Sequence, residues 1–134
     1  MEFCMGGVSR CCTPAVPRCR VVAPFYGGIP RDAGALKGIC PAVGGWGRTD
    51  LIYGGHGDRL ADHLDALGMP HEFKTYDNVG HSFMNNHQTF AFKKLGGGIT
   101  NARQVRCHGG VGQLAERVLV FFKRVFSGEL KAQG

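Results

Sequence analysis

The chain has 134 residues, a length that suits one domain and leaves little room for two. Hydrophobic residues make up 43% of it and charged residues 19%, which is ordinary for a globular protein and excludes a mainly disordered chain. The net charge of +6 comes from basic residues scattered along the sequence, and no run of about 18 apolar residues occurs, so we expect neither a nucleic-acid partner nor a membrane partner.

Three strands are predicted in chain order, at residues 20–26, 39–46 and 71–77, and the first two have the apolar character of buried strands. The first is an apolar run rich in β-branched residues that ends at a pair of glycines, and the second is weakened by two glycines of its own. A helix is predicted between the second and third strands and another after the third, at 58–67 and 113–126. Strands that alternate with helices in this way indicate parallel βαβ units and the α/β class.

Both predicted helices carry their apolar residues on one face and have recognisable ends. Asp58 is a plausible N-cap of the first helix, and Gly68 and Gly128 are plausible stops for the first and second. Glycine is over-represented in the whole chain, with 22 residues, and part of the excess falls in segment 96–112, which is predicted to be a loop.

The first residues lack the basic and apolar pattern of a signal peptide, so we expect a cytoplasmic protein with six reduced cysteines. The cysteine spacings are irregular and contain no C-x2-C pair. A structural zinc site, which needs several ligands at regular spacing, is therefore not expected.

Three short motifs carry residues with catalytic chemistry. Cys4 is followed closely by glycine, as a nucleophile on a sharp strand-to-helix turn requires. Asp50 follows the second predicted strand and His81 follows the third, where a carboxylate can orient a histidine base. Asp32 and Asp58 are alternative carboxylates. The order nucleophile, acid, histidine is that of the α/β-hydrolase fold.

These motifs are Phe-Cys-Met-Gly-Gly at 3–7, Ala-Pro-Phe-Tyr-Gly-Gly at 23–28, Gly-Arg-Thr-Asp at 47–50 and Gly-His-Ser-Phe-Met-Asn at 80–85. Together they resemble the dienelactone hydrolase family. The resemblance implies an α/β-hydrolase fold and a Cys-Asp-His triad that hydrolyses a small-molecule ester or lactone without a metal or organic cofactor. It implies that Cys4 is the nucleophile, Asp50 the orienting acid and His81 the base. It further implies an oxyanion-hole N–H from Met5, and pocket walls from Tyr26, Trp46 and Phe83.

The resemblance covers the C-terminal half of the family's domain. The family has a half-domain before its nucleophile and a glycine two residues before it, whereas only three residues precede Cys4 here and Glu2 takes the glycine's place. We therefore expect residues 1–134 to form a single truncated domain, a partial α/β-hydrolase fold with about three parallel strands. The alternative function is a non-catalytic remnant that associates with another protein chain, including a second copy, through an open sheet edge.

Overall fold

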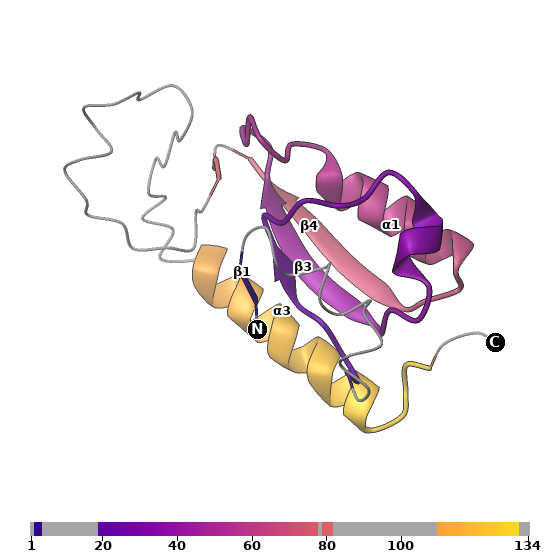
Figure 1. Ribbon diagram of the computed structural model, residues 1–134. Helices are drawn as coiled ribbons and strands as arrows, with labels where there is room; N and C mark the ends of the chain where they lie inside the picture. The colour runs from indigo at the N-terminus through magenta and orange to yellow at the C-terminus, as the bar shows by residue number, and fades with distance from the viewer. Residues whose placement is uncertain (1, 4–18, 78, 82–109, 132–134) are drawn as a thin grey trace.

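The computed structural model (Figure 1) describes residues 2–3, 19–77, 79–81 and 110–131. Within these ranges, one sheet of four parallel strands has the order β1-β2-β3-β4. The strands are β1 (Glu2–Phe3), β2 (Pro24–Phe25), β3 (Ala42–Gly47) and β4 (His71–Tyr76), and the helices are α1 (His56–Ala66), α3 (Gly110–Phe126) and the short 3₁₀ helix η2 (Ala33–Leu36).

The α/β class and the three parallel strands predicted from the sequence are confirmed in β2, β3 and β4, and β1 adds a fourth strand. The first predicted strand is much shorter than expected. Only two residues form β2, and Val22 ahead of it makes an isolated bridge to Ala42. Pro24 has no N–H to donate, so a continuous ladder cannot form through that position.

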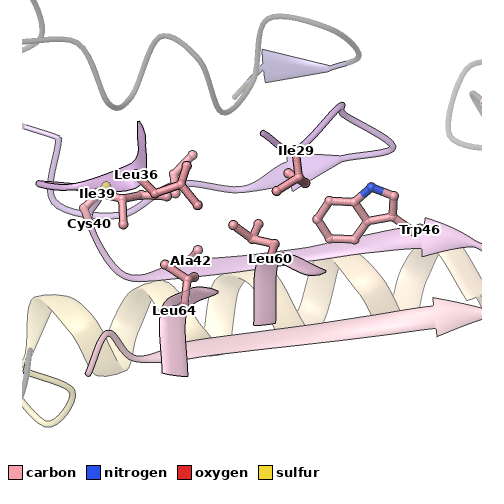
Figure 2. Packing of buried hydrophobic residues seen from close by; sticks show 9 residues of the cluster. Ile29, Leu36, Ile39, Cys40, Ala42, Trp46, Leu60 and Leu64 are labelled. Carbon is pink, nitrogen blue, oxygen red and sulfur yellow. The ribbon is translucent and has the colours of Figure 1, made fainter. Parts of the chain in front are cut away.

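One face of the sheet packs against α1. Ala42 and Trp46 of β3 contact Leu60 and Leu64 of α1 in a buried cluster that also holds Ile29 (Figure 2). Leu60 and Leu64 are four residues apart and therefore lie on the same side of the helix. The buried side of the helix is thus the apolar face on which the sequence-based prediction of this helix rested.

The opposite face of the sheet packs against α3, as Figure 1 shows. Val43, the neighbour of Ala42 in β3, points to this side because successive side chains of a strand alternate between faces. It lies in a second buried cluster with Leu114, Val118 and Phe121 of the helix. Helices on both faces leave β3 buried at all six positions, which is typical of a parallel sheet.

The sequence signals for the two helix C-termini and for one N-cap can be compared with the helix ends in the structure. Gly68 and Gly128 follow α1 and α3 with φ of 61° and 80°, and each is part of a Schellman motif, so both predicted stops are confirmed. The predicted N-cap is wrong: α1 begins earlier in the chain, with Gly55 at the N-cap and Asp58 in the first turn.

The start of α3 also differs from the sequence-based prediction. The helix begins at Gly110, so residues 110–112 of the predicted loop 96–112 are helical, and the rest of that segment lies outside the described residues. No helix in the described part of the chain combines the length and the apolar character that crossing a bilayer requires.

Candidate active site

Asp50 and His81 form a buried hydrogen-bonded pair at the carboxyl edge of the sheet. Asp50 follows β3 and His81 follows β4, and the two residues are only 4% and 7% exposed. His81 Nδ1 lies 3.0 Å from Asp50 Oδ2. An ionised carboxylate can only accept, so Nδ1 carries the ring proton in this pair and Nε2 is the basic nitrogen. Such a pairing orients a histidine for work as a general base.

The backbone around Asp50 fixes the direction of its carboxylate. Oδ1 accepts hydrogen bonds from the N–H groups of Ile52 at 2.8 Å and Tyr53 at 3.0 Å. This turn, in which an Asp side chain accepts from the N–H two residues on, is a common local habit of aspartate. With Oδ1 held by the turn, Oδ2 is the oxygen that faces the histidine.

The two other carboxylates considered from the sequence are excluded as partners of His81 by their positions. Asp32 caps η2 by accepting from Gly34 N–H at 2.8 Å, and its side chain is exposed. Asp58 is exposed in the first turn of α1, where a negative charge is favoured by the helix dipole. Both residues have ordinary structural roles.

Close backbone packing brings the histidine loop onto the aspartate loop. Thr49 N–H donates to Val79 O at 3.1 Å, and Arg48 N–H donates to Tyr76 O at 2.9 Å. A Cβ atom at Gly47 would lie 2.2 Å from Val79 O, a distance that no real side chain tolerates. Glycine at position 47 is therefore a condition for the approach of the two loops.

Two tyrosines flank the histidine ring. Tyr26 makes an edge contact with His81 at a centroid separation of 5.3 Å, and Tyr53 lies 5.5 Å from it in a tilted arrangement. Tyr26 is fully buried directly after β2 and has a φ of 41°, a left-handed conformation that strains a bulky side chain. Strain of this kind is typical of residues whose position matters for a site.

Trp46 has the contacts of a core residue. It is 1% exposed, donates its indole N–H to Gly27 O at 3.1 Å, and makes an edge contact with Phe73 at 5.4 Å. A Cβ at Gly57 would lie 2.8 Å from its ring, so the start of α1 rests directly on the indole. A role for Trp46 as a pocket wall stays a prediction.

A second histidine lies beside the pair. His56, at the start of α1, contacts Tyr53 at a centroid separation of 5.2 Å and accepts a hydrogen bond on Nδ1 from Ile29 N–H at 2.9 Å. Burial, followed by the nearby positive charge of Arg59, lowers the pKa of His56 below its ordinary value, and the Asp50 carboxylate opposes this shift. The ring therefore favours the neutral form. In that form Nδ1 can accept the Ile29 N–H and so stabilise the turn between β2 and η2.

The other predicted site residues, Cys4, Met5 and Phe83, lie outside the described residues. Strand β1 ends at Phe3, immediately before Cys4 in the sequence. Among the described residues, no three His, Cys, Asp or Glu side chains gather in the way that a metal ion requires.

Comparison with known proteins identifies the family of this chain. The model of the dienelactone hydrolase family matches residues 1–124. The chain belongs to the dienelactone hydrolase family. A carboxymethylenebutenolidase of Rhodococcus opacus is 34% identical over 96 residues, an alignment that covers 63% of this chain and 38% of the relative. This dienelactone hydrolase family member therefore aligns with less than half of the length of that curated relative.

Sequence reasoning missed Tyr53, whose N–H holds Asp50 and whose ring lies between the two histidines. An aspartate four residues before the glycine pair at 54–55 indicates a turn, and an Asp turn with its backbone N–H donors could have been predicted from it. The roles of Gly47 and His56 depend on contacts with distant segments, which no local pattern reveals.

Proposed function

We propose that this protein hydrolyses carboxylic esters or lactones with Cys4 as nucleophile, His81 as general base and Asp50 as the acid that orients the histidine. The observation that carries the proposal is the buried hydrogen bond of 3.0 Å between Asp50 and His81. Membership of the dienelactone hydrolase family and likeness to a carboxymethylenebutenolidase support the same reaction class.

In the proposed reaction, His81 Nε2 accepts the proton of the Cys4 thiol, and the thiolate attacks the ester carbonyl carbon. The Met5 N–H stabilises the negative oxygen of the tetrahedral intermediate. The intermediate collapses to a thioester when the C–O bond breaks and the leaving alkoxide takes the proton from His81. A water molecule, deprotonated by His81, then attacks the thioester and releases the carboxylic acid and the Cys4 thiol. Asp50 keeps the imidazole in the Nδ1–H tautomer throughout.

The strand register supports the choice of Cys4. Phe3, the residue before Cys4, pairs with Phe25, and Phe25 is followed by Tyr26, whose ring contacts His81. In a parallel sheet the carboxyl ends of all strands meet at one edge, which is where ligands bind in open α/β folds. The nucleophile, acid and base of the proposal thus each follow a strand end of the same sheet.

The experiment is hydrolysis of a small activated ester, measured for the wild type and for Cys4→Ala. We expect the wild type to show a rapid acyl-enzyme burst that iodoacetamide prevents, and Cys4→Ala to show neither burst nor turnover above background. Cys107→Ala is the matched control, because it removes a thiol to which no motif assigns a role, and it should behave as the wild type. Equal rates for the wild type and Cys4→Ala would contradict the proposed mechanism.

The second candidate function is association with another protein chain through the β1 edge of the sheet, without catalysis. Three apolar side chains of α3 favour association with another chain and offer it a second surface, on this helix: Leu119, Val120 and Phe126 are 60%, 49% and 52% exposed. Exposed apolar side chains gathered on one element mark surfaces that other chains cover. Light scattering over a range of concentrations tests this candidate: a mass that rises with concentration supports it, and a constant monomer mass contradicts it.

A further inference from the structure

Two cysteine thiols touch at the amino-terminal end of the sheet, away from the Asp50–His81 pair. Cys40 Sγ donates to Cys19 Sγ across 2.9 Å, although the residues are 21 positions apart in the sequence. Cys40 belongs to the buried cluster between the sheet and α1, and it lies at the end of that cluster opposite Trp46 (Figure 2). The sulfur atoms need to approach by less than about 1 Å to reach the bond length of a disulfide, about 2.05 Å.

The pairing of the neighbouring backbone holds the two thiols together. Cys19 and Cys40 shortly precede Val22 and Ala42, which form a parallel bridge. Val22 N–H donates to Pro41 O at 2.9 Å, and Val43 N–H donates to Val22 O at 3.0 Å. Adjacent backbones in a sheet lie about 4.8 Å apart, which falls within the Cα separation that disulfides span. The contact is thus built into the sheet.

The two thiols differ in access. Cys19 is half-buried and Cys40 is only 7% exposed. A small oxidant in solution therefore meets Cys19 first, and Cys40 is held in position to react with whatever forms there. An accessible thiol backed by a second thiol within reach is the arrangement of a redox-sensitive pair.

We propose that Cys19 and Cys40 form a reversible disulfide by exchange with a low-molecular-weight disulfide of the glutathione type. The Cys19 thiolate attacks one sulfur of the small disulfide, so that a mixed disulfide forms at Cys19 and one small thiolate leaves. Cys40, after losing its proton, attacks Cys19 Sγ, and the second small thiolate leaves. The two protein thiols give up two electrons and two protons, and one small disulfide becomes two small thiols.

The disulfide closes a loop that contains β2 and Tyr26, which contacts the histidine of the site. Cross-linking its ends restricts the unfolded chain, and a loop of this length gives a stabilisation that corresponds to a rise of roughly 10 °C in the midpoint of thermal unfolding. The pair therefore makes the stability of the sheet dependent on the redox state of its surroundings.

The test treats the full wild-type chain with oxidised glutathione, blocks the remaining thiols and digests the protein with trypsin under non-reducing conditions. We expect peptide Cys19–Arg20 joined to peptide Gly38–Arg48, with the loss of two hydrogens and full reversal by dithiothreitol. Glutathione that stays on Cys19 while Cys40 is alkylated would overturn the proposal, as would a bond from Cys40 to any other cysteine.

A variant with serine at the four remaining cysteine positions isolates the pair for the stability measurement. We expect its unfolding midpoint to rise by roughly 10 °C on oxidation and to return on reduction. Adding Cys40→Ser to this variant gives the matched control, in which glutathione should stay on Cys19 and no such rise should occur. An equal rise in the control would overturn the proposal. If the serine variant does not fold, the peptide map of the wild type decides the question.

Discussion

Replacement of Asp50 by asparagine should reverse the tautomer of His81 while it leaves the fold almost intact. The N–H groups of Ile52 and Tyr53 hold one carboxylate oxygen at 2.8 and 3.0 Å, so the amide oxygen of the introduced asparagine must take that place. The amide NH₂ group then faces His81 Nδ1, which lies 3.0 Å from the oxygen it replaces. Nδ1 has to become an acceptor, the ring proton moves to Nε2, and the basic nitrogen is lost.

The expected losses of unfolding free energy distinguish Asp50→Asn from Asp50→Ala. Asparagine preserves all three hydrogen bonds in number, so we expect a loss in unfolding free energy of at most about 1.5 kcal/mol. Alanine leaves three donors without their acceptor at a site where the Asp50 side chain is 0% exposed. At about 1–3 kcal/mol for a buried donor, and less for the part-buried N–H groups of Ile52 and Tyr53, the loss should be about 3 kcal/mol. The proposed hydrolysis should fall by about 10³–10⁴-fold with asparagine, because the wrong tautomer disables the base.

Nitrogen NMR of the His81 ring in the wild type and Asp50→Asn reads the tautomer directly, and denaturant unfolding of both variants reads the stability. The tautomer measurement does not depend on enzymatic activity. Retention of the Nδ1–H tautomer in Asp50→Asn would refute the reasoning. So would an Asp50→Asn variant that is as unstable as Asp50→Ala.

Two further predictions concern the surroundings of the site. Gly47→Ala should lower the unfolding free energy by about 1–3 kcal/mol, because the new Cβ would lie 2.2 Å from Val79 O; Gly112→Ala, with nothing within 4 Å, is the matched control and should lose no stability. His56→Asn should reduce the acid sensitivity of the fold. The pKa of His56 is lowered by folding, so its stabilising contribution is complete above a pH of about 6.5 and is lost as the pH falls below that value. The asparagine side chain can still accept from Ile29 N–H but does not titrate. Denaturant unfolding of the wild type and His56→Asn at about pH 7.5 and about pH 5.5 checks this. If both proteins lose the same unfolding free energy between the two pH values, His56 is not the group that makes the fold acid-sensitive.

Local sequence determined the parts of this protein that depend on neighbours in the chain. The apolar spacing around Leu60 and Leu64 predicted α1, and the stops at Gly68 and Gly128 were predicted because a left-handed residue after a helix is a property of glycine itself. The positions of Asp50 and His81 after two successive strands were also available from the sequence, since each follows a segment with the pattern of a strand.

Only the tertiary structure decided which carboxylate meets the histidine and what holds them together. The sequence favoured Asp50 because it follows a predicted strand, but it left Asp32 and Asp58 as alternatives, since both also stand near turns or helix starts. The choice depends on the approach of the β4 loop to the β3 loop at Gly47, on the N–H donors of the Asp50 turn and on burial between packed elements. The contact between Cys19 and Cys40 has the same origin. The two side-chain contacts join residues 21 and 31 positions apart, and they exist only once parallel pairing has brought the strands side by side.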